Sequence, residues 1–240
     1  NYNLGLTFQE LSQLDDAVKS YEKAVALKPD YAEAHANLGN ALKELGQLDE
    51  AVKCYEKALT LKPDFAEAHN NLGNVFKELG QLDDAVKSYE KALALKPDYP
   101  EAHNNLGNAF QELGQREDAT KSYEKALALQ PDNAEAHNNL GKAFQELGQR
   151  EDAAKSYEKA LAVNPNYAEA HNNLGIVFKE LGQLDAAVKI FKKALAIKPD
   201  YIEVNYNLGV TLKELGRLED AVKSYEKAVA LKPDYAEAHA

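Results

Sequence analysis

The sequence predicts an all-α fold in which pairs of helices stack into a solenoid, and two observations carry that prediction. The chain repeats itself every 34 residues: the unit AEAHANLGNALKELGQLDEAVKCYEKALTLKPDF at 32–65 recurs with few changes from residues 66, 100, 134, 168 and 202. Each unit contains two stretches with apolar residues at helical spacing, separated by a Gly and closed by a Pro. Such units bury their apolar faces only by stacking on their neighbours.

The repeat frame divides the chain into one continuous array. The first unit lacks three residues, and the last residues begin a further helix. The boundaries are 1–31 for the truncated first repeat, then 32–65, 66–99, 100–133, 134–167, 168–201 and 202–235 for six full repeats, and 236–240 for the start of the next helix. Because each repeat needs its neighbours, we treat 1–240 as a single domain.

The unit 66–99 illustrates the first helix of a repeat, which we call helix A. Asp64 is expected to cap it, and Glu67, three residues on, supplies the other half of a capping box. Gly80 is expected to end the helix in the left-handed conformation. In the first repeat Ser12 replaces this Gly, which makes that turn less favourable. The apolar face consists of Leu72, Val75, Phe76 and Leu79.

The second helix of the unit, helix B, begins with acidic residues that complement the helix dipole and is stopped by Pro97. Gly73 lies in the interior of helix A, where Gly costs about 1 kcal/mol relative to Ala. Its recurrence in every repeat therefore predicts a close approach of the two helices, with Ala85 and Ala92 as the small partners on helix B and with Tyr89 and Phe76 filling the wider gaps.

These residues resemble the tetratricopeptide repeat: Leu72, Gly73, Phe76, Ala85, Tyr89, Ala92 and Pro97, at intervals that recur over essentially the whole chain. The resemblance implies a right-handed superhelical solenoid of antiparallel helix pairs. It also implies a concave wall made chiefly by the A helices, which in this family commonly holds an extended peptide. His69 departs from the family, which most often has a large aromatic residue at this position.

Composition excludes several classes of function. The net charge of −11 repels phosphate backbones and anionic lipids, so we expect neither nucleic acid nor a membrane surface as a partner. No apolar run approaches the roughly 20 residues that span a bilayer. We expect a soluble, cytoplasmic chain, although a start in the middle of a repeat would hide any upstream targeting signal. Cys54 is the only cysteine, so no intrachain disulfide can form.

No catalytic site is expected, because no nucleophile–base pair or phosphate-binding loop recurs. No cofactor is expected either. The histidines occupy one slot per repeat, and neighbouring helices lie about 8 to 10 Å apart, too far for shared zinc ligation at about 2 Å. We therefore interpret them as packing residues and expect no metal site. They are His35, His69, His103, His137, His171 and His239.

Asparagines on helix A are the candidate peptide-binding residues. One slot holds an unbroken column, and an amide both donates and accepts hydrogen bonds, so such a column can hold the main chain of an extended peptide without reading its sequence. It resembles the asparagine ladder in the repeat domain of protein O-linked N-acetylglucosamine transferase. Alternatively, each asparagine bonds to a neighbouring helix and locks the stack. The asparagine column consists of Asn3, Asn37, Asn71, Asn105, Asn139, Asn173 and Asn207.

Two further sets of asparagines extend this candidate site. One set, the inner asparagines, precedes the column: Asn70, Asn104, Asn138 and Asn172. The other follows it one turn along the helix: Asn40, Asn74 and Asn108. This last slot changes to Lys142, Ile176 and Val210 in later repeats, so we expect an amide-rich face that becomes more apolar toward the C-terminus.

An acidic column is explained first by capping and only second as a rim that attracts basic peptides: Glu33, Glu67, Glu101, Glu135, Glu169, Glu203 and Glu237.

The preferred function is a non-enzymatic protein-protein interaction scaffold that holds an extended peptide in the Asn-lined groove. One alternative is the substrate-recruiting arm of a larger transferase, and another is a self-assembling structural array. Because the terminal repeats have no polar caps, head-to-tail self-association through the chain ends is also expected.

Overall fold

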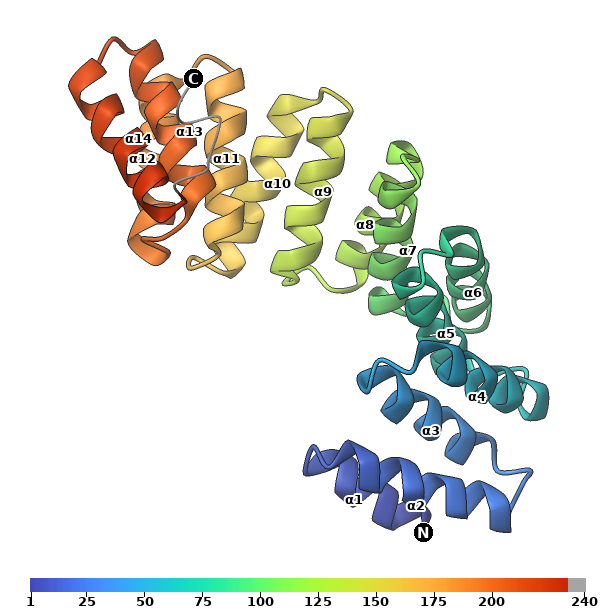
Figure 1. Cartoon of the computed structure of the whole chain (residues 1–240). Helices are drawn as coiled ribbons and strands as arrows, with labels where there is room; N and C mark the ends of the chain where they lie inside the picture. Colours follow the sequence, from blue (N-terminus) through green and yellow to red (C-terminus); the bar gives the residue numbers. More distant parts are fainter. Residues whose placement is uncertain (233–240) are drawn as a thin grey trace. The chain divides into compact units, whose positions relative to one another are not determined.

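The computed structural model describes residues 1–232, which form helices joined by short turns (Figure 1). The chain divides into two compact units, one from Asn1 to Leu129 and one from Gln130 onward. Among the described residues the first unit contains α1 (Tyr2–Glu10), α2 (Leu14–Leu27), α3 (Ala32–Glu44), α4 (Leu48–Leu61), α5 (Ala66–Glu78), α6 (Leu82–Leu95), α7 (Pro100–Glu112) and α8 (Arg116–Leu129). The second contains α9 (Ala134–Glu146), α10 (Arg150–Val163), α11 (Ala168–Glu180), α12 (Leu184–Ile197), α13 (Ile202–Glu214) and α14 (Leu218–Leu231).

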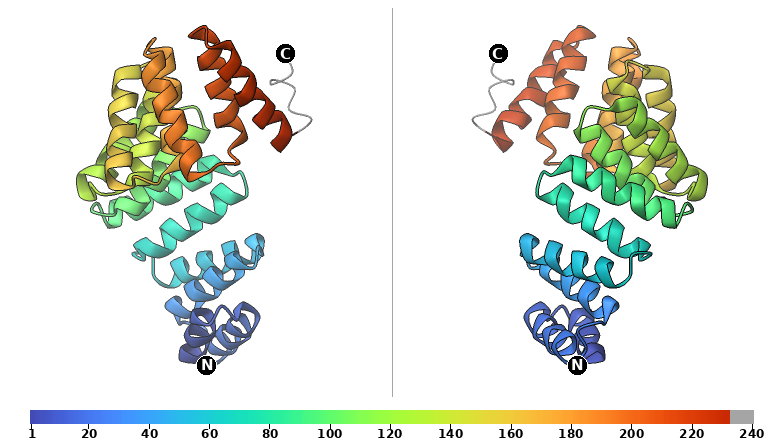
Figure 2. Two further views of the ribbon diagram at one scale, coloured as in Figure 1. Left: turned by 90° about the vertical axis from the view of Figure 1, so that its left-hand side faces the viewer. Right: turned by 90° about the vertical axis from the view of Figure 1, so that its right-hand side faces the viewer.

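Odd-numbered helices are the predicted A helices and even-numbered ones the B helices, so the all-α helix-pair fold is confirmed. Within each unit every helix packs on the next, and A helices of neighbouring repeats also touch, as α5 touches α7 and α11 touches α13. The two further views in Figure 2 show, within each unit, the helix pairs stacked one on the next. The predictions for His239, Glu237 and a helix starting at 236 lie outside the described residues.

The A helices from α3 to α13 each end in a turn that contains the predicted glycine. Gly80 has φ +73°, the N–H of Gln81 donates to the carbonyl of Phe76 at 2.8 Å, and the N–H of Gly80 donates to that of Lys77 at 3.0 Å. These two bonds form a Schellman motif, which satisfies carbonyls that the helix itself leaves open. Ser12 takes the same conformation at φ +57°, where a side chain is strained.

The helical glycine makes room for an aromatic ring rather than for a small residue. Tyr89 is fully buried, and a Cβ added to Gly73 would lie 2.6 Å from its Cε1 atom. The same contact recurs at Gly107 with Tyr123 and at Gly175 with Phe191. The prediction of a close approach is thus confirmed, and the ring of the helix B aromatic residue is the group that approaches.

The predicted capping box is wrong. The residue before α5 is Phe65, one position after Asp64, and its side chain makes no capping hydrogen bond. Glu67 instead pairs with Lys96 at 3.4 Å, and Glu33 pairs with Lys62 at 3.0 Å. The acidic column therefore ties the start of helix A to the end of helix B in these two repeats. In α9 the slot before the helix holds Asn133, whose side chain accepts from the N–H of Ala136 at 2.9 Å.

Candidate functional site

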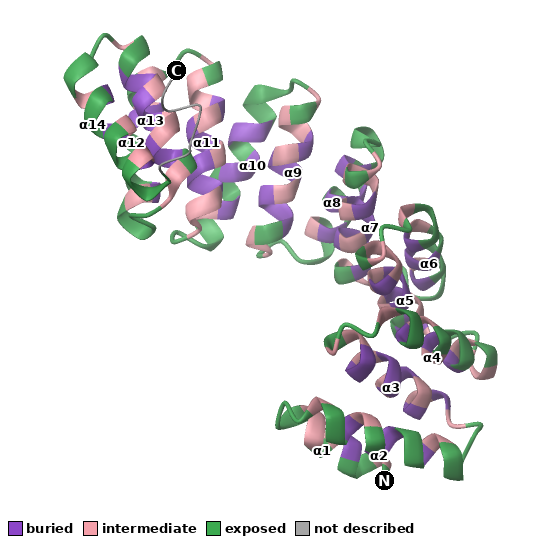
Figure 3. Ribbon diagram, viewed as in Figure 1, coloured by how far each residue is buried: buried purple, intermediate pink, exposed green. Residues whose placement is uncertain are grey.

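The asparagine column lies at the surface of the A helices but is not fully open to solvent. Asn3 is exposed, and the other six members, from Asn37 to Asn207, are half-buried. Figure 3 shows how buried residues gather where paired helices face each other, while exposed residues follow the turns and the outer faces. The column thus stands at the border between the core and solvent, where a side chain can serve the stack and a ligand together.

The inner asparagines lie inside the stack rather than on its surface. Asn70 and Asn138 are 0% exposed, and Asn104 and Asn172 are each 8% exposed. The inner asparagines and the column are adjacent on each helix, and their burial is what separates the two sets.

Three of the four inner asparagines, Asn70, Asn138 and Asn172, accept hydrogen bonds from the column of the following repeat, whereas the buried Oδ1 of Asn104 has no partner among the described residues. Asn105 Nδ2 donates to Asn70 Oδ1 at 3.2 Å, and Asn207 Nδ2 donates to Asn172 Oδ1 at 3.1 Å. In the earlier repeats the amide nitrogens of the column donate to other groups. Asn71 Nδ2 donates to Asn40 Oδ1 at 3.0 Å, and Asn37 Nδ2 donates to the Tyr2 hydroxyl at 2.9 Å. The amide nitrogens of these column residues therefore belong to the stack, as the alternative interpretation of the column required.

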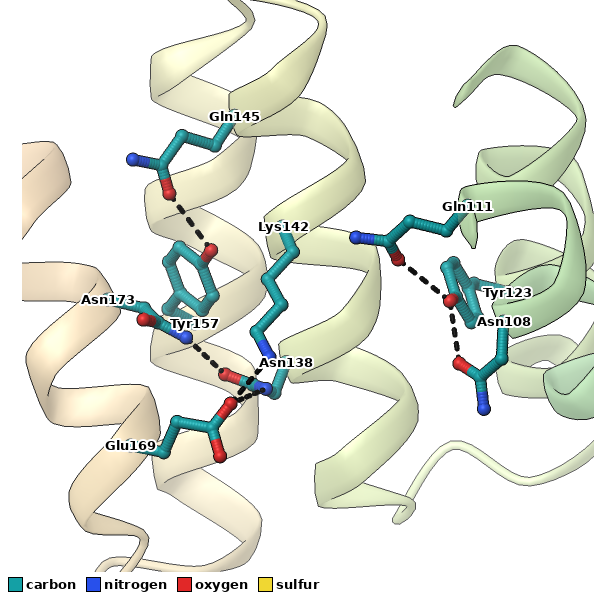
Figure 4. A network of polar contacts seen from close by, with 9 residues as sticks. All are labelled: Asn108, Gln111, Tyr123, Asn138, Lys142, Gln145, Tyr157, Glu169 and Asn173. Carbon is teal, nitrogen blue, oxygen red and sulfur yellow. Dashed lines mark hydrogen bonds and ion pairs between the residues drawn. The ribbon is translucent and has the colours of Figure 1, made fainter. Parts of the chain in front are cut away.

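A carboxylate fixes the direction of this chain of bonds in the second unit (Figure 4). Asn138 Nδ2 donates to Glu169 Oε1 at 3.4 Å, and Lys142 pairs with the same oxygen. A carboxylate only accepts, so Asn138 turns its Oδ1 toward Asn173, which must donate to it, as it does at 3.1 Å. The Oδ1 of Asn173 is then directed away from Asn138.

Three members of the column consequently present acceptors rather than complete amides, whereas the Oδ1 atoms of Asn37 and Asn71 accept from Asn40 and Asn70 within the protein. Among residues 1–232, the Oδ1 atoms of Asn105, Asn173 and Asn207 have no hydrogen-bond partner, and none is a buried unsatisfied atom. Solvent therefore reaches each of them. Each open carbonyl oxygen can accept from an N–H group of a bound main chain, whereas the Nδ2 donors of these three asparagines are already used.

The third set of asparagines serves the buried tyrosines. The hydroxyl of Tyr89 donates to Asn74 Oδ1 at 2.8 Å, and that of Tyr123 lies 2.7 Å from Asn108 Oδ1 and 2.9 Å from Gln111 Oε1, so its one proton is shared between two acceptors. Figure 4 shows the Tyr123 pair. Such bonds keep a buried hydroxyl satisfied.

Later repeats lose the asparagine in this third set and change the hydroxyl's partner with it. Where Lys142 replaces the asparagine, the hydroxyl of Tyr157 donates to Gln145 Oε1 at 3.1 Å instead. In the next repeat Phe191 replaces the tyrosine and Ile176 replaces the asparagine. Because both the hydroxyl and its acceptor are absent, no buried polar group is left without a hydrogen bond. The two substitutions occur in the same repeat, so this pairing is visible in the sequence.

The histidines hold the loop that precedes each repeat. Nε2 of His69 lies 3.1 Å from the carbonyl oxygen of Pro63, and the same bond recurs at His103 with Pro97 at 2.9 Å. Burial lowers the pKa of the ring, so the neutral form with a proton on Nε2 is favoured. Five such loop-bonding histidines are described: His35, His69, His103, His137 and His171.

Two remaining features bear on reactivity and location. Cys54 is half-buried, and burial raises the pKa of its thiol to about 11, which suppresses thiolate chemistry near neutral pH. Within residues 1–232 no group of three or more His, Cys, Asp or Glu side chains is placed to hold a metal ion. No helix in the described part is both long and apolar enough to cross a membrane.

The stacked helix pairs, the glycine–aromatic contact and the polar A helices define a tetratricopeptide-repeat protein, a class of solenoids that act as protein-protein interaction scaffolds. Within that class the chain belongs to the family described as the cilia and flagella-associated protein 70 C-terminal domain, whose model matches residues 13–240. None of the curated proteins matches the chain in sequence.

Solved structures agree with the tetratricopeptide-repeat fold. The chain is similar to YrrB, described as a TPR protein with an unusual peptide-binding site, with 26% identity, a TM-score of 0.68, and coverage of 78% of this chain and 97% of that one. It is also similar to MamA, with 30% identity, a TM-score of 0.66, and coverage of 69% and 97%. The C-terminal part of a TPR repeat-containing protein from Cytophaga hutchinsonii has a TM-score of 0.80 over 100% of this chain and 98% of that one; at 17% identity it shows the fold alone.

Proposed function

We propose that this scaffold binds an extended peptide segment along the A helices, with the Oδ1 atoms of the asparagine column accepting hydrogen bonds from the peptide main chain. The observation that carries the proposal is the set of open acceptors on Asn105, Asn173 and Asn207, whose amide nitrogens are held by the preceding repeat. Because the stack fixes each amide plane, the acceptors are ordered before the ligand arrives, which lowers the entropic cost of binding. The peptide-binding site in the description of YrrB is consistent with this proposal.

The inner asparagines and the third set have supporting roles in this proposal. Asn70, Asn138 and Asn172 orient the column, and Asn74 and Asn108 satisfy buried tyrosines. We assign contact with the peptide main chain to the column alone. The side chains one turn further along helix A supply sequence preference, because they change from amide to Lys142, Ile176 and Val210.

The test selects ligands from a phage-displayed library of random 12-residue peptides and measures their affinity by fluorescence anisotropy. Changing Asn105, Asn173 and Asn207 together to Ala should weaken binding by at least about tenfold, which corresponds to about 1.4 kcal/mol. Peptides N-methylated at single residues test the same contact from the ligand side. Methylation of an N–H group that faces the column should weaken binding, whereas methylation of an N–H group that faces away should not. The matched control is Asn166→Ala, an exposed loop position.

Unchanged affinity in a triple variant that keeps its helical circular dichroism would refute peptide contact by the column. The asparagines would then serve the stack alone. Equal tolerance of N-methylation at every peptide position would refute main-chain recognition even if the triple variant were impaired.

Head-to-tail self-association rests on a different observation. Leu4 in α1 is 49% exposed, whereas its equivalents Leu72 and Leu106 are each 7% exposed beneath a preceding repeat. On α14, Val222 is 54% exposed, whereas its equivalent Val188 is 4% exposed. These two faces are the ones that neighbouring repeats cover elsewhere, so a second copy can cover them. Sedimentation velocity from micromolar to millimolar concentration should show oligomers that Leu4→Glu abolishes; a monomer at every concentration would contradict the proposal.

A further inference from the structure

A groove recurs between the B helices of neighbouring repeats. In the first unit it lies between α4 and α6 over α5, with a volume of about 700 Å³, and again between α6 and α8 over α7, with about 690 Å³. In the second unit it lies between α10 and α12 over α11, with about 640 Å³. No member of the asparagine column lines any of the three. The grooves are therefore a surface separate from the proposed peptide site.

Each groove has an apolar floor and an exposed apolar residue at its end. His69, Leu72 and Phe76 form the floor of the first groove. The corresponding His and Leu line the other two grooves, and the corresponding Phe lines the groove over α11. At the end of helix B, Leu95 is 44% exposed, Leu129 is 40% exposed and Ile197 is 36% exposed. Large apolar side chains left open at the same place in each groove indicate a surface that another apolar group can cover.

The two walls of each groove carry opposite charges. The wall from the preceding repeat carries a glutamate, and the wall from the following repeat carries a lysine, in the pairs Glu56 and Lys91, Glu90 and Lys125, Glu158 and Lys193. None of these six side chains has an ion-pair partner among the described residues. Each groove therefore offers one acidic and one basic flank to whatever enters it.

The polar atoms at the base of the grooves are already used inside the protein. The hydroxyl of Ser88 donates to the carbonyl of Asp84 at 2.8 Å, that of Thr60 donates to the carbonyl of Glu56 at 2.8 Å, and Nε2 of His69 is bonded to Pro63. Nδ1 of His171 has no partner but is a single covered atom. An extended segment placed here would leave those of its N–H and C=O groups that face the groove floor unpaired, at a cost of about 1 to 3 kcal/mol for each one that is buried. An α-helix satisfies them internally.

We propose that these grooves bind an amphipathic α-helix of a partner protein. Its inner face carries aliphatic or aromatic residues, the flank beside the glutamates carries Lys or Arg, and the flank beside the lysines carries Glu or Asp. In the first groove the lining of α6 runs from Asp84 to Leu95, about 17 Å at 1.5 Å per residue, which accommodates about three turns of helix. Repetition of the groove also allows a long partner, or several copies, to bind in register with the repeats.

The test uses three fluorescein-labelled peptides of 14 residues, measured by fluorescence anisotropy against the full chain. The matched peptide has Leu at helical spacing, Lys on one flank and Glu on the other. The second peptide exchanges the two flanks, and the third places Pro at the centre. The matched peptide should bind, the exchanged peptide should bind at least about tenfold more weakly because like charges meet, and the Pro peptide should show no binding because its helix is broken.

Two protein variants assign the binding surface. The groove variant carries Leu95→Glu, Leu129→Glu and Ile197→Glu, all at exposed positions that a charge should not unfold. It should lose at least about tenfold in affinity for the matched peptide. The variant with Asn105, Asn173 and Asn207 changed to Ala should bind that peptide as the parent chain does.

Several outcomes would overturn the inference, and none depends on the proposed function. Loss of binding only in the asparagine variant would place the helical peptide on the other face. Equal affinity for the matched and exchanged peptides would refute the charged flanks, and equal affinity for the Pro peptide would refute a helix. Self-association of the parent chain that the groove variant abolishes would make a second copy of this chain the occupant.

Discussion

The glycine in the middle of helix A provides the sharpest test of how the repeats pack. We predict that Gly73→Ala destabilises the protein, although helix propensity alone favours Ala by about 1 kcal/mol. The reason is the close approach of Tyr89, whose Cε1 would lie 2.6 Å from the new Cβ and whose Cδ1 would lie at 2.7 Å. Real Cβ contacts are longer, and the ring cannot retreat because Tyr89 is 0% exposed and its hydroxyl is bonded to Asn74.

The expected magnitude is the difference of two opposing effects. Overpacking a core by one carbon costs about 1 to 3 kcal/mol, and the gain in propensity returns about 1 kcal/mol. The net loss for Gly73→Ala is therefore about 0 to 2 kcal/mol. Gly39→Ala is a matched comparison at the same slot, because its Cβ would lie 3.0 Å from the Cζ of Tyr55, and it should be the milder change.

A double variant separates steric from intrinsic effects. In a Tyr89→Ala background the obstacle is gone, so Gly73→Ala should there become stabilising, by about 1 kcal/mol. Urea unfolding followed by circular dichroism measures the change in the free energy of unfolding for each variant. Hydrogen exchange of α5 and α6 shows whether that change is local to this repeat, since repeat arrays unfold region by region. A stabilising Gly73→Ala in the parent chain, or no change of sign in the Tyr89→Ala background, would refute the reasoning.

Three further predictions follow from individual contacts. Ser12→Gly should stabilise the first repeat by about 1 kcal/mol, because Ser12 has φ +57°; an unchanged melting temperature would contradict this. Burial lowers the pKa of His69, His103, His137 and His171. The unfolded chain then binds protons more readily, so stability should be full above about pH 6.5 and fall as the pH drops below it. Urea midpoints between pH 8 and pH 5 check the slope, which His→Gln at these four positions should flatten. Phe191→Tyr should cost about 1 to 3 kcal/mol by burying a hydroxyl beside Ile176, and adding Ile176→Asn should recover most of that loss; a single variant as stable as the parent would contradict the role of the paired change.

The repeat period and its local signals made the helix pairs predictable. Residues such as Gly80 and Pro97 act on the backbone nearest to them, through the left-handed conformation of one and the missing N–H of the other, so their effect can be read without knowing the rest of the fold. The prediction that Asp64 caps the helix was wrong because the helix begins one residue later than expected, so Phe65 occupies the capping position. Helix ends are the part of a pattern that is hardest to predict to the residue.

The sequence by itself determined the helices, their order, their glycine-ended turns and the continuous column of asparagines. Tertiary structure decided which atoms of that column remain open, because Asn173 donates to Asn138 only when two repeats are stacked. Tertiary structure also divided identical residue types into buried and surface roles, as it did for Asn70 and Asn71. Both decisions depend on contacts 31 to 35 residues apart, and a local pattern contains no information about which atom meets which across such a distance. The grooves between B helices exist only in the stacked array, for the same reason.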